Sequence, residues 1–183
     1  MSARVQRRPT TPVRRGVALI FVALSLVACG PAATRSAHGS GGGPSSGSAP
    51  LASRIVPASA LQLQLAHGPT VLIFIATGCA SCAADVGQLR QALARYPGVQ
   101  AVGIDTIPQD TPAELASFLD NADLTDAPLL WTIDTDGSLV ARYQMAMLDA
   151  TVGIDRHGVV VFRNPVPADA GKLASQLSAL AKA

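Results

Sequence analysis

Residues 71–89 read VLIFIATGCASCAADVGQL, and this stretch decides the fold. Its first five residues, VLIFI, form a short apolar run rich in β-branched side chains, which is typical of a buried parallel strand. A helical pattern follows, in which apolar residues recur at spacings of three and four: Val86, Leu89, Leu93 and Tyr96. Cys79 and Cys82 lie between the two patterns, so the sequence predicts a CxxC pair at the start of a helix.

The residues that follow continue to alternate between strand and helix patterns. Further strands are predicted at residues 99–105, 129–133, 151–154 and 159–162, the last two as a β-hairpin around a Gly-ended turn. Thr111-Pro112-Ala113-Glu114 forms a capping box that opens the second helix. The last helix is amphipathic and carries Leu173, Leu177 and Leu180. This order predicts an α/β fold with a central mixed β-sheet flanked by helices on both faces.

Two segments have weaker patterns. Residues 139–147 fit either a short helix or an extended connector. Residues 51–70 are predicted to add an N-terminal strand or hairpin to the sheet.

Residues 1–28 have the pattern of a secretory signal peptide, with five arginines, no acidic residue and then a 12-residue apolar run. As a helix this run is about 18 Å long, short of the roughly 30 Å core of a bilayer. Leu26-Val27-Ala28-Cys29 resembles the bacterial lipobox, which implies cleavage before Cys29 and acylation of that residue. An ordinary signal peptide with an incidental cysteine is the alternative, and Arg14-Arg15 fits a twin-arginine signal poorly.

Residues 29–50 are predicted to be the lipidated Cys29 and a disordered tether of Gly, Ser, Ala and Pro. Residues 51–183 are predicted to form one folded domain. Without the five leader arginines the chain has nine basic and twelve acidic residues, a net charge of −3, so nothing favours nucleic acid. We expect the domain to lie on the extracytoplasmic face of a bacterial cell membrane, anchored through lipid on Cys29.

The CxxC pair has a physical reason to be reactive. The free N–H groups and the positive dipole end of a helix N-terminus favour a thiolate on Cys79. Cys82 lies one turn further along the same helix face, which puts the two Cα atoms roughly 5 Å apart, within disulfide range. We therefore expect Cys79 to attack a substrate disulfide and Cys82 to resolve the mixed disulfide.

The pair has two other interpretations. A zinc site would need two more Cys or His ligands, and the sequence offers only His67 and His157, so no metal is expected. A purely structural disulfide is compatible with an oxidising compartment, but it would close a loop of only four residues and remove little entropy from the unfolded chain.

Residues 71–89 resemble the thioredoxin superfamily, and most closely its TlpA/ResA-like, membrane-tethered branch. Residues 102–106, 129–143 and 150–162 are similar to further segments of that branch, so the resemblance covers most of residues 68–182. It implies a thioredoxin-like fold with Cys79 as nucleophile, Cys82 as resolving thiol and a redox-active disulfide in place of a cofactor. It also implies client protein thiols or disulfides and a membrane redox partner, and we expect a monomer.

Three positions depart from the pattern of that branch. Gly78 stands where the branch has Trp, and Asp85 stands where it has Glu, as a candidate proton acceptor for Cys82. Asp149 stands at the position of a cis-proline that faces the cysteines. A cis bond before Asp costs several kcal/mol more than one before Pro, so the sequence leaves open whether this bond is cis or trans. If the side chain faces Cys79, its carboxylate opposes a Cys79 thiolate. A rival alignment puts Pro128 at this position, but it leaves a surplus hairpin before the last helix.

The sequence favours an exported thiol–disulfide oxidoreductase that reduces or oxidises client proteins, and Ala80-Ser81 does not decide the direction. A peroxiredoxin-like peroxidase is one alternative, but Ala76 stands where that chemistry uses Thr or Ser. A copper-delivery or copper-binding lipoprotein is another. The two-residue spacing of the CxxC and the place of His157 in a predicted turn both disfavour it.

Overall fold

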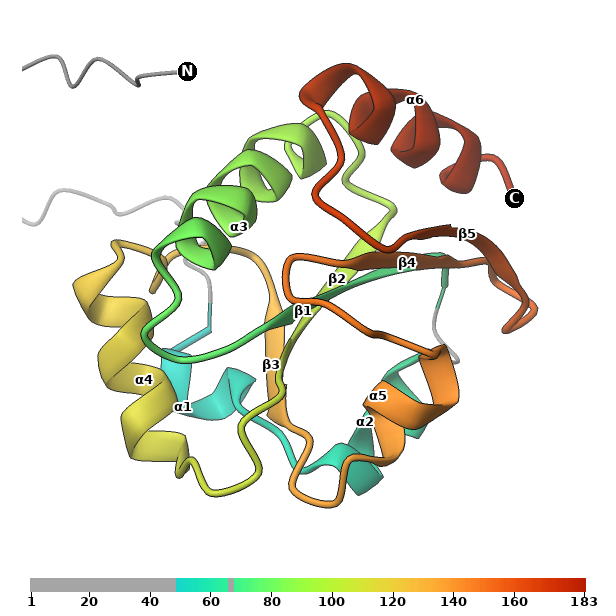
Figure 1. Ribbon diagram of the computed structural model, residues 1–183. Helices are drawn as coiled ribbons and strands as arrows, with labels where there is room; N and C mark the ends of the chain where they lie inside the picture. Colours follow the sequence, from blue (N-terminus) through green and yellow to red (C-terminus); the bar gives the residue numbers. More distant parts are fainter. Residues whose placement is uncertain (1–48, 66–67) are drawn as a thin grey trace, which may run out of the picture. The chain divides into compact units, whose positions relative to one another are not determined.

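The computed structural model describes residues 49–65 and 68–183 (Figure 1). The predicted signal peptide, Cys29, the tether up to residue 48 and His67 lie outside the described residues. In the part of the chain that is described, no helix is both long enough and apolar enough to cross a membrane.

Within these residues, five strands form one mixed sheet in the order β3-β2-β1-β4-β5. The strands are β1 (Thr70–Ile75), β2 (Gln100–Asp105), β3 (Leu130–Ile133), β4 (Thr151–Ile154) and β5 (Val160–Asn164). β1 and β2 are parallel, as are β2 and β3, whereas β4 runs antiparallel to both β1 and β5. The prediction of a mixed sheet is confirmed, and the strand that leads to the CxxC pair lies at its centre.

Helices cover both faces of this sheet (Figure 1). They are α1 (Leu51–Arg54), α2 (Ala58–Leu65), α3 (Ala80–Leu93), α4 (Pro112–Asn121), α5 (Ser138–Tyr143) and α6 (Ala170–Leu180). Successive side chains of β1 point to opposite faces. Val71, Ile73 and Ile75 pack with the buried side chains of α3, α4 and α6. Leu72 and Phe74 pack on the other face with those of α2 and α5, so the predicted two-faced architecture is confirmed.

Short polar signals determine where two of the helices begin. At α4 the predicted capping box is present: Thr111 Oγ1 accepts from the Glu114 N–H at 3.3 Å, and Glu114 Oε2 accepts from the Thr111 N–H at 2.8 Å. At α5 the Asp134 carboxylate accepts from the N–H groups of Leu139 and Val140 at 3.0 and 2.9 Å. The open choice for residues 139–147 is therefore settled as a short helix that ends at Tyr143.

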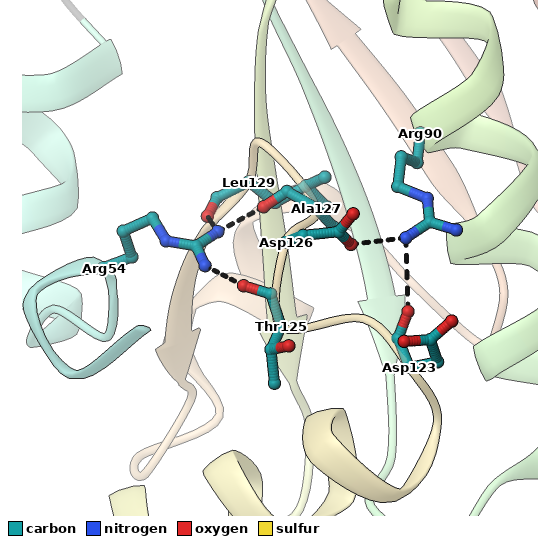
Figure 2. A network of polar contacts seen from close by, with 7 residues as sticks. All are labelled: Arg54, Arg90, Asp123, Thr125, Asp126, Ala127 and Leu129. Carbon is teal, nitrogen blue, oxygen red and sulfur yellow. Dashed lines mark hydrogen bonds and ion pairs between the residues drawn. The ribbon is translucent and has the colours of Figure 1, made fainter. Parts of the chain in front are cut away.

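The prediction of a strand or hairpin within residues 51–70 is wrong, because α1 and α2 occupy this segment and only Thr70 belongs to a strand. Ile55 makes a single isolated bridge to Trp131 of β3. The buried Arg54 guanidinium instead donates to three backbone carbonyls before β3, those of Thr125, Ala127 and Leu129 (Figure 2). A side chain thus satisfies the carbonyl groups here, and the segment docks as helices against the sheet edge.

Candidate functional site

The chain reaches the CxxC pair through a tight turn after β1. Gly78 has φ +78°, a left-handed conformation that glycine adopts without strain, and the Cys79 N–H donates to the Ala76 carbonyl at 3.2 Å. Apart from Gly78 itself and its two neighbours in the chain, no residue has an atom within 4 Å of the point where a side chain of Gly78 would begin. The rim of the site is therefore open at the position where the similar branch has Trp.

Cys79 is the N-cap of α3, so the pair lies at the start of a helix, as predicted. Its backbone is extended, and its Sγ accepts a hydrogen bond from the Cys82 N–H at 3.2 Å. The two cysteines form a disulfide with a Cα–Cα distance of 5.3 Å. One N–H group of the first helical turn thus points at the Cys79 sulfur, and together with the helix dipole it favours negative charge there once the disulfide is reduced.

The two sulfur atoms differ in their access to solvent. Cys79 is half-buried, whereas Cys82 is completely buried among the apolar residues of one core layer. A client protein can therefore reach Cys79 but not Cys82. This asymmetry suits Cys79 to intermolecular attack and Cys82 to attack within the chain.

Asp149 lies opposite the pair, and only Ala150 separates it from β4. Its N–H donates to the Phe74 carbonyl at 2.8 Å and the Phe74 N–H donates to the Ala150 carbonyl at 3.0 Å, which extends the β1–β4 ladder beyond Thr151. Asp149 has φ +62°, and none of the peptide bonds in the described residues is cis. The side chain is 6% exposed, and a carboxylate oxygen lies within 4.8 Å of both Cys79 Sγ and Cys82 Sγ.

The rival alignment does not fit this arrangement. Pro128 precedes β3, which lies at the edge of the sheet, and β2 separates β3 from the strand that leads to the cysteines. Asp149 precedes β4, which pairs directly with β1. The position opposite the cysteines therefore belongs to Asp149.

Asp85 lies on the same helix as the pair, one turn after Cys82. Partial burial, and then the negative charge of Asp149, raise its pKa above the ordinary value for a carboxyl group. Within the described residues its side chain accepts a hydrogen bond from Gln88 at 3.2 Å. The two acidic side chains singled out from the sequence thus lie near each other, and Asp149 is the one that reaches the sulfur atoms.

Ser81 is a member of the site that the sequence did not single out. Its hydroxyl donates to Asp149 Oδ2 at 3.1 Å and lies 3.3 Å from Cys79 Sγ. It therefore bridges the exposed sulfur and the buried carboxylate. The available signal was the hydroxyl residue inside the CxxC itself, but its partner is 68 residues away in the chain.

A second acidic pair, which the sequence also did not reveal, lies beneath the loop before the cysteines. Asp105 ends β2 and is fully buried, and burial raises its pKa to about 7 with a further contribution from Asp110. The Thr77 hydroxyl donates to Asp110 Oδ2. This contact ties the acidic pair to the turn that carries Cys79.

His157 lies apart from the cysteines. It is exposed in the turn between β4 and β5, where its N–H donates to the Asp155 carboxylate at 2.8 Å. Among the described residues, the one group of three or more candidate metal ligands consists of Cys79, Cys82 and Asp149. Within residues 68–183, therefore, no histidine lies beside the cysteine pair to support the copper-binding alternative.

No protein-family model matches the sequence, and no curated protein matches it. Solved structures do match. DsbF of Mycobacterium tuberculosis, in its mixed oxidised and reduced forms, is 26% identical over 64% of this chain and 84% of its own, with a TM-score of 0.54. A secreted disulfide oxidoreductase of Mycobacterium tuberculosis, homologous to DsbE of E. coli, is 28% identical over 64% of this chain and 86% of its own, with a TM-score of 0.53.

A more distant structure has the same fold. The exposed lipoprotein thioredoxin of Streptococcus pneumoniae is 18% identical over 64% of this chain and 89% of its own, with a TM-score of 0.53. These similarities confirm the thioredoxin-like fold. The first two also confirm the resemblance to thioredoxin-like thiol–disulfide oxidoreductases that the sequence predicted.

Proposed function

We propose that this thioredoxin-like oxidoreductase exchanges disulfides with client proteins on the outer side of a bacterial membrane, held there by lipid on Cys29. The observation that carries the proposal is the Cys79–Cys82 disulfide at the start of α3, with one sulfur accessible and the other buried. Two neighbours that are more than 25% identical, DsbF and a secreted disulfide oxidoreductase, support the same chemistry.

In the reducing direction the Cys79 thiolate attacks a client disulfide. One client sulfur leaves as a thiolate, and a mixed disulfide joins Cys79 to the client. The Cys82 thiolate then attacks the Cys79 sulfur and releases the second client thiol. The client gains two electrons, and the Cys79–Cys82 pair loses two and returns to a disulfide. The same steps in reverse oxidise a client, and a membrane redox partner restores the starting state.

We assign Asp149 and Asp85 to the handling of protons at this pair. Ser81 gives Asp149 a hydrogen-bonded connection to the Cys79 sulfur, with Ser81 Oγ 3.3 Å from Cys79 Sγ and 3.1 Å from Asp149 Oδ2. Through that connection a proton of the Cys79 thiol can pass to the carboxylate, which relieves the repulsion between two negative groups. Asp85, one turn after Cys82 on α3, is assigned to the Cys82 thiol.

The reaction is tested on the full chain with Cys29→Ser, so that only the pair can react. This variant is also the matched control, since it removes a thiol that is not part of the pair. We expect it to reduce the disulfides of insulin in the presence of dithiothreitol, and Cys79→Ser to abolish that activity. Cys82→Ser should accumulate a mixed disulfide with the client. Full activity in the Cys79→Ser variant would refute the proposal.

The anchor is tested separately, in bacterial cells. We expect the unchanged chain to incorporate a labelled fatty acid and to sediment with the membrane fraction. Cys29→Ser should lose both properties. If Cys29→Ser stays in the membrane fraction, the lipid on Cys29 is excluded as the anchor. That result would not affect the proposed dithiol chemistry.

A further inference from the structure

The carboxylate of Asp149 is unusual in its surroundings. The residue is 6% exposed, its Oδ2 accepts the hydrogen bond from Ser81, and its Oδ1 has no partner. A buried polar atom without a partner costs about 1–3 kcal/mol and calls for an explanation. The one ion pair in the described residues, Arg90 with Asp126 at 2.5 Å, does not involve this carboxylate.

The same carboxylate is aimed at two potential metal ligands. One carboxylate oxygen of Asp149 and the Sγ atoms of Cys79 and Cys82 lie within 4.8 Å of one another. Cys82 and Asp149 are both buried. In the reduced chain two thiols and a buried carboxylate would share this small volume, and Asp85 lies near that carboxylate outside the group. A divalent cation neutralises such a group of acidic ligands.

We propose that the reduced chain binds one Zn²⁺ through Cys79, Cys82 and Asp149. Each thiol loses its proton on binding, so two protons are released, two Zn–S bonds form and no electron is transferred. Zn²⁺ takes thiolate sulfur and carboxylate oxygen together, whereas harder cations avoid sulfur. This inference rests on the proposed function only in requiring that the disulfide can be reduced.

The local geometry suits three protein ligands and an open fourth position. A CxxC spacing is common in zinc sites, and the Cα–Cα distance of 5.3 Å holds both sulfurs on one side of the helix start. Ligand atoms around tetrahedral zinc are roughly 3–4 Å apart, given bonds of about 2.0–2.3 Å, so the three atoms need only small movements. Ser81 orients the carboxylate from outside, and the exposed side of Cys79 leaves room for water.

Such a site exists in only one redox state. A disulfide has no thiolate to offer, so the oxidised chain lacks two of the three ligands. In the reduced chain zinc occupies the same electron pairs that attack a client disulfide. Zinc therefore holds the enzyme in a reduced and inactive form, and it competes with both client and oxidant.

The test uses the full chain with Cys29→Ser, reduced and then freed of reductant under anaerobic conditions. Zn²⁺ is titrated in competition with a chromophoric chelator, and Co²⁺ serves as a spectroscopic probe whose charge-transfer band reports thiolate ligands. We expect one Zn²⁺ per reduced chain, none per oxidised chain, and a thiolate band with Co²⁺. Asp149→Ala should weaken Zn²⁺ binding by more than about 100-fold, beyond the 10–100-fold cost of losing an outer-shell partner.

Asp85→Asn is the matched control, because it removes a nearby negative charge but no atom of the ligand group. It should weaken binding by less than about tenfold, below the 10–100-fold range of an outer-shell effect. Equal affinity of the unchanged and Asp149→Ala chains, or no binding by the reduced chain, would overturn the zinc site. Titration of two thiols with a colorimetric reagent tests the dithiol independently. Two reactive thiols without zinc binding refute this inference alone, whereas a disulfide that cannot be reduced refutes the proposed function.

Discussion

Replacing Asp105 by Asn should remove a loss of stability that the chain suffers as pH rises. Asp105 ends β2, its side chain is fully buried, and its Oδ2 has no hydrogen-bond partner. Burial, and to a smaller extent the neighbouring Asp110, raise its pKa from the ordinary 3.8 to about 7. The backbone N–H groups of Ile107 and Thr77, which favour the ionised form, offset only part of this effect.

The sign follows from which state holds the proton. Between about pH 4 and about pH 7 the folded chain keeps Asp105 neutral, whereas the unfolded chain has already lost the proton. The free energy of unfolding therefore falls as pH rises, by about 1.4 kcal/mol per pH unit. Over about three units the loss approaches 4 kcal/mol. The stabilisation that the folded chain has while Asp105 is neutral is fully present below about pH 4 and is lost above about pH 7.

The measurement is urea unfolding of the full oxidised chain at several pH values. Trp131 is the single tryptophan and is completely buried, so its fluorescence reports the transition. Asn has nearly the same shape as Asp and no charge. The free energy of unfolding of Asp105→Asn, relative to that of the unchanged chain, should therefore rise by about 4 kcal/mol between pH 4 and pH 8. Asp120→Asn, on the exposed side of α4, is the control. A difference between the Asp105→Asn and unchanged chains that does not vary with pH would refute the reasoning.

Three further substitutions test the packing and the polar contacts by the same unfolding measurement. Gly103→Ala would place a Cβ 2.1 Å from the ring of Trp131, so the ring must move. We expect the free energy of unfolding to fall by about 3 kcal/mol or more, and a fall of less than about 1 kcal/mol would contradict this packing. Arg54→Met leaves buried carbonyl groups without their donor and should cost about 2–4 kcal/mol, whereas an unchanged midpoint would show that the contacts in Figure 2 add nothing. Thr111→Ala removes half of the capping box with Glu114 and should cost about 1 kcal/mol, and an effect above about 2 kcal/mol would indicate another role.

Most of the fold could be predicted because the strands and helices carry local signals. Residues 71–75 are apolar throughout because β1 is buried on both faces at the centre of the sheet. Thr111-Pro112-Ala113-Glu114 determines the start of α4 through contacts within the same four residues. Signals of this kind need no knowledge of the rest of the chain.

The prediction for the N-terminal segment was wrong for the opposite reason. Residues 51–70 dock through Arg54, whose partners at residues 125–129 are more than 70 positions away. A long cationic side chain that satisfies buried carbonyls has no periodicity and no fixed spacing in the sequence. The helices of this segment are stabilised by the docking, and a pattern search cannot anticipate it.

The residues of the candidate site also fall into those that a local pattern predicts and those that depend on distant parts of the chain. Cys79 and Cys82 follow from one helix and its dipole, so spacing alone brings them together. Asp85 lies on the same helix, but it was singled out through the resemblance. Asp149 could be placed only through the resemblance, since its contact with Ser81 spans 68 residues. The burial of Asp105 beneath the loop of Thr77 depends on how β1 and β2 pair, which no local pattern records.

The residue at position 149 also changes how the chain is held against the cysteines. A proline has no N–H and a φ near −65°, so it can neither donate to the Phe74 carbonyl nor adopt the φ of +62° found here. Asp149 makes that ladder bond at 2.8 Å and presents its carboxylate to Ser81 and the sulfurs from the same backbone conformation. The acidic group is thus built into the main chain of the site. Proline at this position, as in the branch that the sequence resembles, would remove the charge and disrupt the backbone that carries it, so only substitutions such as Asp149→Asn or Asp149→Ala separate the two effects.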